Sequence, residues 1–312
     1  MSPPGRPKGE FRSAQHEGTP VSPPGRPKGE FRSAQHEGTP VSDTRQAAPT
    51  VHLVGAGPGD PELLTIKAVR AIRQATLLLV DDLVGAAVLR YARRSARIVH
   101  VGKRGGCAST PQAFIERLMA AEALNGERVV RLKGGDPFMF GRGGEELAHL
   151  RALGLRVEVV NGITAGLAAA TSIGVPLTHR AHAHGVMFVT GHARGDGEGL
   201  DWPALAAAAA QGLTLVIYMG IATIEAIEAG LLQGLAGATP VAIVQHASLP
   251  QQRHARCPLA ELAQTVAREG LGSPAIIVVG AVAAVARGFA PPVIADDAPA
   301  PAVGVAAQRR FG

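Results

Sequence analysis

Apolar runs and amphipathic segments alternate along the chain from Val51 onward. Short runs of Val, Leu and Ile predict strands at residues 51–54, 76–80, 97–101, 128–132 and 156–160. The segments between them predict helices at 62–75, at 84–94 and from Thr110 to Met119. Thr110 is expected to cap the last of these, with Pro111 in its first turn. Strands that alternate with helices predict an α/β fold with a mostly parallel sheet.

The pattern changes over residues 161–176, where small residues between two turns predict a short helix and a domain junction. Further strands are predicted at 186–190, 213–219, 241–245 and 275–280, with helices at 204–210, 224–232 and 259–269. We therefore expect an N-terminal α/β domain at 51–161 and a C-terminal α/β domain at 162–289. The sequence pattern does not show whether the strands of the second sheet run parallel or antiparallel.

Both ends of the chain differ from this pattern. Residues 2–21 recur letter for letter as residues 22–41, and the repeat is rich in Pro, Gly and charged residues without apolar periodicity. Such a segment cannot bury a core, so residues 1–50 are predicted to be a disordered extension. Residues 290–312, rich in Pro and Ala, are expected to form a second loose tail.

Composition excludes several classes of function. The net charge is +6, but only 4% of the residues are aromatic and dense basic runs are absent, which argues against a nucleic-acid partner. Two cysteines, Cys107 and Cys257, support neither a disulfide framework nor a Cys-based zinc site. No apolar run is long enough to span a membrane. We expect a cytoplasmic protein that binds an anionic small molecule.

The stretch VVRLKGGDPFMFGRGGEE at 129–146 predicts a buried strand, a Gly-rich loop and a helix with acidic residues in its first turn. Its five glycines, from Gly134 to Gly144, allow the backbone to approach a ligand closely. Asp136 and Arg142 lie among them, where open α/β sheets bind ligands. The alternative is a structural turn, which would need only one or two glycines.

The first loop, GAGPGDPELL at 55–64, loosely matches a dinucleotide fingerprint with Asp81 about 20 residues beyond it. A nicotinamide-dependent dehydrogenase is therefore an alternative. Asp60 stands where the fingerprint needs a small residue, and its carboxylate would repel a pyrophosphate. Pro58 and Pro61 also lack the amide protons that would face phosphates. The loop suits a neutral or cationic ligand better.

Three histidines, His179, His182 and His184, invite a metal hypothesis. Their spacing lacks a nearby matching carboxylate or cysteine group, so no metal site is expected. Contacts to substrate carboxylates, or a structural role, remain the preferred interpretations.

Ten motifs occur in the order that the uroporphyrinogen-III C-methyltransferases show, and between Val51 and Phe289 the chain resembles that family. The motifs are GAGPGDPELLT, VDDLV, GKR, STPQ, VVRLKGGDPFMFGRGGEE, VxxGITA, PLTHR, VTGH, YMG and SPAIIVVG. The resemblance implies two α/β domains with S-adenosylmethionine in the cleft between them, in a homodimer. It implies methylation of carbons 2 and 7 of uroporphyrinogen III, through precorrin-1 to precorrin-2, for cobalamin or sirohaem. Another precorrin methyltransferase is the close alternative.

The resemblance also implies roles for individual residues. Positions matching the family's donor contacts are Pro58, Gly134, Gly135, Asp136, Met139, Thr164, Ala165, Met219 and Ala247. By residue type alone, Met139 and Met219 could equally fill gaps in a core.

For the reaction, the resemblance implies Asp81 as proton acceptor and Lys103 as donor. Arg104 is either a substrate clamp or, alternatively, the base, although a guanidinium rarely gives up its proton. For Asp81 the alternative is a helix cap, a role that Asp82 could equally fill. Uroporphyrinogen III carries eight carboxylates, and its expected partners are Arg104, Arg142, Arg180 and His179.

Overall fold

The computed structural model describes residues 49–102, 110–192 and 199–285, which form two five-stranded sheets. The first sheet has the order β3-β2-β4-β1-β5 and every pairing in it is parallel. Its strands are β1 Thr50–Gly55, β2 Leu77–Val80, β3 Arg97–His100, β4 Val129–Lys133 and β5 Arg156–Val160. The predicted α/β class and parallel sheet are confirmed. The first strand begins at Thr50, inside the predicted tail.

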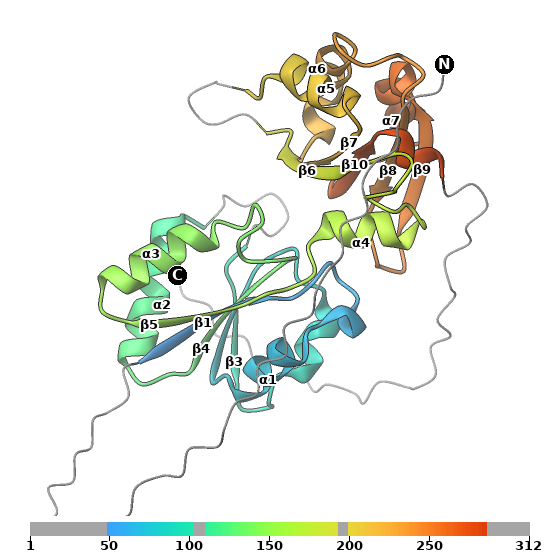
Figure 1. Cartoon of the computed structure of the whole chain (residues 1–312). Helices are drawn as coiled ribbons and strands as arrows, with labels where there is room; N and C mark the ends of the chain where they lie inside the picture. The colour runs from blue at the N-terminus through green and yellow to red at the C-terminus, as the bar shows by residue number, and fades with distance from the viewer. Residues whose placement is uncertain (1–48, 103–109, 193–198, 286–312) are drawn as a thin grey trace, which may run out of the picture. The chain divides into compact units, whose positions relative to one another are not determined.

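Both faces of the first sheet are covered, as the wholly apolar and buried strand β2 requires. Alternate residues of β2 point to opposite faces, with Leu77 and Leu79 in one buried cluster and Leu78 and Val80 in another. The helices α2 (Gln112–Leu124) and α3 (Gly143–Ala152) cover one face, and α1 (Ile66–Gln74) covers the other, as Figure 1 shows. The sheet is thus the middle of three layers.

Two local predictions in this half are wrong. The segment predicted as a helix at 84–94 contains only a 3-10 helix, η2 Ala86–Tyr91. A shorter 3-10 helix, η1 Pro61–Leu63, precedes α1. Thr110 does not cap α2, because the N-cap position is Pro111 and the first helical residue is Gln112. The helix therefore begins one residue later than the Thr-Pro pair indicated.

The second sheet has the order β6-β7-β10-β8-β9 and is mixed. Only β6 and β7 are parallel, and the other three pairings are antiparallel. Its strands are β6 Gly185–Thr190, β7 Leu213–Tyr218, β8 Pro240–Gln245, β9 Arg253–Pro258 and β10 Ala275–Val279. The edge strand β9 was not predicted, because its sequence RHARCP has neither an apolar run nor clean alternation.

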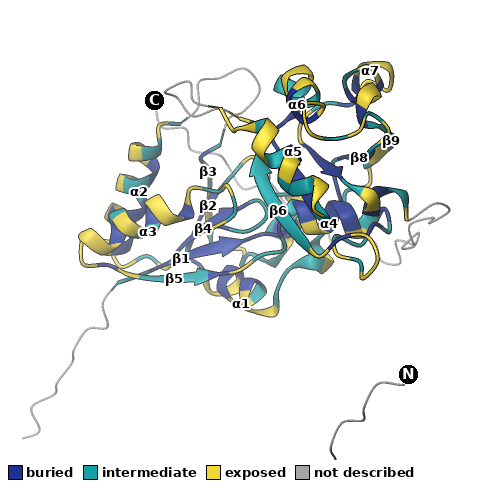
Figure 2. Ribbon diagram, turned by 45° about the horizontal axis from the view of Figure 1, so that its top comes forward, coloured by how far each residue is buried: buried dark blue, intermediate teal, exposed yellow. Residues whose placement is uncertain are grey.

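Helices also cover both faces of the second sheet. The α-helices α5 Trp202–Ala210, α6 Ile224–Leu231 and α7 Leu262–Arg268 contribute to one buried cluster. On the other face, α4 (Ala165–Ser172) packs with Val216 and Val244 of the sheet. Short 3-10 helices complete this half: η3 Ile221–Thr223, η4 Leu259–Glu261 and η5 Ala281–Ala284. In Figure 2 the dark blue of buried residues marks central strands such as β1 and β8, whereas the edge strand β6 is teal, the colour of intermediate burial.

The change between the two sheets falls near the predicted junction. The last strand of the first sheet ends at Val160, and α4, which packs on the second sheet, begins at Ala165. The described residues nevertheless belong to one compact unit, so the division at 161/162 stays a prediction. The predicted tail at 290–312, and that at 1–50 up to residue 48, lie outside the described residues.

Among the helices that the structure describes, none combines the length and apolar character needed to cross a bilayer.

Core packing on the first sheet can be tested at Leu79, which is fully buried. We expect Leu79→Ala to lower the free energy of unfolding by about 2–5 kcal/mol, because it removes buried methyl groups and leaves a cavity. Leu124→Ala is the matched control, since that side chain is 64% exposed. Urea unfolding should show a change within about 0.5 kcal/mol for the control. Equal losses in both variants would contradict this assignment of the core.

Candidate active site at the carboxyl ends of the strands

Three glycine-containing loops meet at the carboxyl end of the first sheet. Gly57 and Gly135 exchange backbone hydrogen bonds, with N···O distances of 3.2 and 2.7 Å. A Cβ atom added to Gly162, in the loop after β5, would lie 2.1 Å from the carbonyl oxygen of Gly135. No side chain fits in that space, so glycine is required by backbone contact. The motif glycines therefore bring the loops after β1, β4 and β5 together.

Asp136 organises two of these loops through its carboxylate. One oxygen, Oδ2, accepts hydrogen bonds from the Gly162 amide at 3.0 Å and from Asn161 Nδ2 at 3.2 Å. The other, Oδ1, accepts from the Phe138 amide at 2.8 Å. A carboxylate can accept about four hydrogen bonds. The half-buried Asp136 therefore retains capacity for one further donor, such as a ligand hydroxyl or ammonium group.

Tyr218, at the end of β7, joins this region to the second sheet. Its hydroxyl lies 2.7 Å from Thr164 Oγ1 and accepts a hydrogen bond from the Gly166 amide at 2.8 Å. Burial raises the pKa of Tyr218, so the phenol keeps its proton over the physiological range. Met219 follows at once, with a left-handed φ of 54° and an exposed side chain. The bond from Tyr218 thus places Met219 beside the segment that contains Thr164 and Ala165.

The first loop makes a similar connection to the end of β8. The amide of Asp60 donates to Ser248 Oγ at 3.3 Å, and Leu249 packs against Gly59. Ala247 stands between His246 and Ser248, which both have left-handed φ values, 52° and 67°. Such conformations are costly for non-glycine residues and concentrate at functional sites. Pro58 and Ala247 consequently lie on neighbouring segments.

Apolar packing completes the set of predicted donor contacts. Met139 and Ala165 pack against the buried cluster that contains Tyr218 and Ala247. Met139 therefore fills space against the core, as its residue type allows, and it also lies in the Gly-rich loop after β4. The structure gathers the predicted donor positions around the joined strand ends: Pro58, Gly134, Gly135, Asp136, Met139, Thr164, Ala165, Met219 and Ala247.

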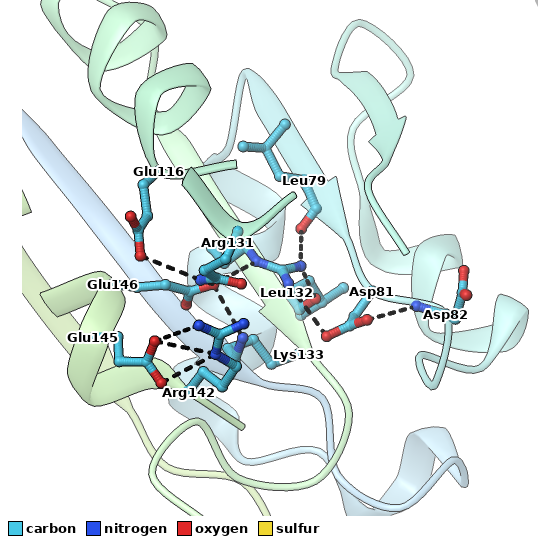
Figure 3. A network of polar contacts seen from close by, with 11 residues as sticks. Leu79, Asp81, Asp82, Glu116, Arg131, Leu132, Lys133, Arg142, Glu145 and Glu146 are labelled. Carbon is cyan, nitrogen blue, oxygen red and sulfur yellow. Dashed lines mark hydrogen bonds and ion pairs between the residues drawn. The ribbon is translucent and has the colours of Figure 1, made fainter. Parts of the chain in front are cut away.

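Asp81 lies at the end of β2 and contacts a buried charge cluster, shown in Figure 3. Its Oδ2 atom is 3.2 Å from Nη2 of Arg131, and its Oδ1 atom accepts the Asp82 amide at 2.9 Å. The side chain remains 32% exposed. Neither aspartate caps a helix, since the N-cap position of η2 is Gly85. The helix-cap alternative is therefore wrong.

Glu146, in the first turn of α3, is the centre of that cluster and is fully buried. Its Oε1 atom accepts from Arg131 Nε at 3.2 Å, from Lys133 Nζ at 3.1 Å and from Gln112 Nε2 at 3.1 Å. Burial, followed by the nearby charge of Arg131, lowers the pKa of Lys133. Arg131 and Glu146 were not among the predicted site residues. The signal was a charged residue inside an apolar strand, which demands a buried partner.

Arg142 forms an ion pair within its own helix turn. Its Nε atom lies 3.0 and 3.1 Å from the two carboxylate oxygens of Glu145. This bond raises the pKa of Arg142 and lowers that of Glu145. Both side chains are exposed and border a hollow of about 340 Å³ beside Pro137 and Phe138. The residues that line this hollow include neither Asp81 nor Asp136.

Two further predicted substrate residues, His179 and Arg180, lie in the turn before β6. Arg180 is exposed, and His179 stacks on His182 with ring centroids 4.6 Å apart. The ranges that the structure covers contain no group of three His, Cys, Asp or Glu side chains placed to hold a metal ion. Lys103 and Arg104 lie outside the described residues.

Comparison with known proteins gives concordant results. The family model of the tetrapyrrole (corrin/porphyrin) methylases matches residues 50–263. A uroporphyrinogen-III C-methyltransferase of Pseudomonas aeruginosa is 55% identical over 233 residues, which are 74% of this chain and 93% of that protein. A sirohaem synthase of Azotobacter vinelandii is 48% identical, and the match covers 74% of this chain but only 50% of that longer protein.

Solved structures agree. A uroporphyrin-III C-methyltransferase from Thermus thermophilus, complexed with S-adenosylhomocysteine, has a TM-score of 0.64 and 40% identity, over 76% of this chain and 99% of that one. A cobalt precorrin-4 methyltransferase has a TM-score of 0.67 and 25% identity, over 75% of this chain and 95% of that one. Because the family model covers most of the sequence and the relatives exceed 30% identity, this chain belongs to the tetrapyrrole (corrin/porphyrin) methylases.

Proposed function

We propose that this chain is an S-adenosylmethionine-dependent C-methyltransferase that converts uroporphyrinogen III through precorrin-1 to precorrin-2, by methylation at C-2 and C-7. The observation that carries the proposal is 55% identity along 93% of a relative with that activity in its name. A precorrin methyltransferase is the second candidate, favoured by the fold likeness to the cobalt precorrin-4 enzyme at the lower identity of 25%. None of the relatives described above is a nicotinamide-dependent dehydrogenase.

The residues around the strand ends fit the proposed methyl donor. Gly135 and Gly162 place no side chain between the backbone segments. The carboxylate of Asp136 can accept one further hydrogen bond, from a group of the ligand. Asp60 would suit a cationic ligand better than a pyrophosphate. Bound there, S-adenosylmethionine would supply a methyl group on a cationic sulfur. Its proposed contacts are Pro58, Gly134, Gly135, Asp136, Met139, Thr164, Ala165, Met219 and Ala247.

The chain's main contribution to methyl transfer is then to hold the two reactants in line. Methylation of a pyrrole carbon leaves a cationic ring that must lose a proton from a neighbouring bridge carbon, which needs a base. We assign this role to Asp81, which is partly exposed at the strand ends. Only the ionised carboxylate can both pair with Arg131 and accept a proton. Arg104 is the alternative base, and Lys103 is the proposed proton donor.

A substrate with eight carboxylates needs fixed cations, and arginine pairs with carboxylate in bidentate fashion. We propose Arg104, Arg142 and Arg180 as clamps, with His179 as a further contact. For Arg142 this requires exchange of its present partner, Glu145, for a substrate carboxylate. The proposed enzyme acts in the cytoplasm as a homodimer.

The activity is tested by incubating the protein with methyl-labelled S-adenosylmethionine and freshly reduced uroporphyrinogen III. We expect two labelled methyl groups per tetrapyrrole, measured by mass spectrometry of the oxidised product. A non-catalytic tetrapyrrole-binding module would retain the porphyrinogen without label. A dehydrogenase would bind a nicotinamide cofactor instead. Either result would exclude the proposed activity.

The donor site is tested at Gly162. Gly162→Ala adds a Cβ that would overlap the carbonyl oxygen of Gly135, so the loops must separate. We expect binding of S-adenosylhomocysteine, measured by titration calorimetry, to weaken at least about tenfold. Gly199→Ala is the matched control, since a Cβ there meets open space. Wild-type affinity in a folded Gly162→Ala protein would place the donor elsewhere.

The substrate clamp is tested at Arg142. Arg142→Ala should raise the Michaelis constant for uroporphyrinogen III about tenfold, because a charged hydrogen bond is lost. Glu145→Gln provides the counterpart, since it releases Arg142 from its ion pair and should leave that constant equal or lower. An unchanged constant in Arg142→Ala would remove this residue from the substrate site.

A further inference from the structure

We infer that Arg131 is a positioning residue for the proposed reaction: it fixes the carboxylate of Asp81 and is itself fixed by the buried Glu146. The inference rests on the proposed function and on Asp81 as its base. Arg131 lies in the middle of β4, between strands β1 and β2, and is 2% exposed. A guanidinium in the interior of a sheet is costly, so its contacts require an explanation.

All three nitrogens of the Arg131 guanidinium donate hydrogen bonds. Its Nε atom donates to Glu146 Oε1 at 3.2 Å, and its Nη2 atom to Asp81 Oδ2 at 3.2 Å. Between them, Nη1 lies 3.4 Å from the Leu79 carbonyl oxygen and 3.3 Å from that of Leu132. A planar fork bound at three nitrogens has one orientation. The position of Asp81 Oδ2 is therefore coupled to the rigid centre of the sheet.

Asp81 is restrained on both of its oxygens yet remains accessible. Oδ2 contacts Arg131, and Oδ1 accepts the amide of Asp82. One third of the side chain is exposed at the edge where the glycine loops meet, whereas Glu146 is fully buried. A base must be held in one geometry and reach its proton, and these contacts meet both needs.

The charges in the cluster balance, with Arg131 and Lys133 facing Glu146 and Asp81. Stability alone does not explain this composition, because replacing buried ion pairs with apolar side chains is often neutral or stabilising. A cluster that served only to attach α3 to β4 would need Glu146 and one cation. The extension of the cluster to Asp81 is the part that a structural role leaves unexplained.

The test is single-turnover methyl transfer, with enzyme in excess over uroporphyrinogen III. We expect Arg131→Met to slow the transfer step at least about tenfold, while affinity for S-adenosylhomocysteine changes less than about threefold. Arg131→Lys, which keeps a cation in the strand, should recover part of the rate and serves as the variant if Arg131→Met fails to fold. Gln112→Leu is the matched control, because Gln112 bonds Glu146 but does not contact Asp81. Its rate should stay within about twofold of wild type.

A double-mutant cycle separates positioning from a general structural effect. In an Asp81→Asn background, Arg131→Met should slow methyl transfer by less than about threefold, because the carboxylate through which Arg131 acts is already missing. Two results overturn the inference: a wild-type rate in the folded Arg131 variants, or an undiminished loss in the Asp81→Asn background. Failure of the proposed function is distinguishable, because the wild-type protein would then transfer no methyl group.

Discussion

Direct contact between backbone segments is the constraint on which the rest of the site depends. Where Gly57, Gly135 and Gly162 meet, carbonyl and amide groups of three loops touch without side chains between them. The parallel sheet brings the ends of β1, β4 and β5 to one edge, and the glycines close the remaining distance. Asp136 then holds the second and third loops with three hydrogen bonds. The aspartate in the motif is thus structural as well as a proposed ligand contact.

The polar groups of the site fall into two kinds. Backbone atoms and Tyr218 join loops from the two sheets through neutral hydrogen bonds. Beneath the loops, Arg131, Lys133 and Glu146 form a charged group with almost no solvent exposure. Neutral contacts can reorganise when a ligand enters, whereas a buried charge cannot lose a partner cheaply. Asp81 lies where the two kinds meet.

The fold could be predicted to the extent that the sequence is periodic. Apolar runs such as LLLV located the strands of the first sheet, and their alternation with helices predicted parallel pairing. The strand RHARCP was missed because an edge strand with exposed positions carries no such run. The segment at 84–94 has apolar residues at helical spacing, but only a 3-10 helix forms. The periodicity of one segment does not distinguish an α-helix from a 3-10 helix.

The motifs identified residues of the site, but they did not identify the side chains with which these residues pair. The loop sequence identified the glycines and Asp136. The spacing of three positions between Arg142 and Glu145 favours their ion pair, but the prediction of Arg142 as a substrate contact did not include it. The apolar neighbours of Arg131 predict a buried strand, but they do not identify the partners of its charge. Its burial depends on Glu146, 15 positions away, and on Asp81, 50 positions away. Pairings at such separations arise from the topology, which a local pattern does not encode.

The Lys133–Glu146 ion pair has a consequence for how this loop can evolve. The two residues are 13 positions apart and bracket the whole Gly-rich segment, so their contact closes it into a ring. Near the start of the ring, Gly135 and Asp136 are tied to other loops, and at its end α3 is fixed by the buried carboxylate. Between these points, the Gly143 amide donates to the Pro137 carbonyl oxygen at 3.0 Å and the Met139 amide donates to that of Asp136 at 3.2 Å. The ring of Phe140 also packs against Tyr218, with centroids 4.8 Å apart. Contacts therefore anchor the ring along its length, and relatives should keep the number of residues between the lysine and the glutamate unchanged.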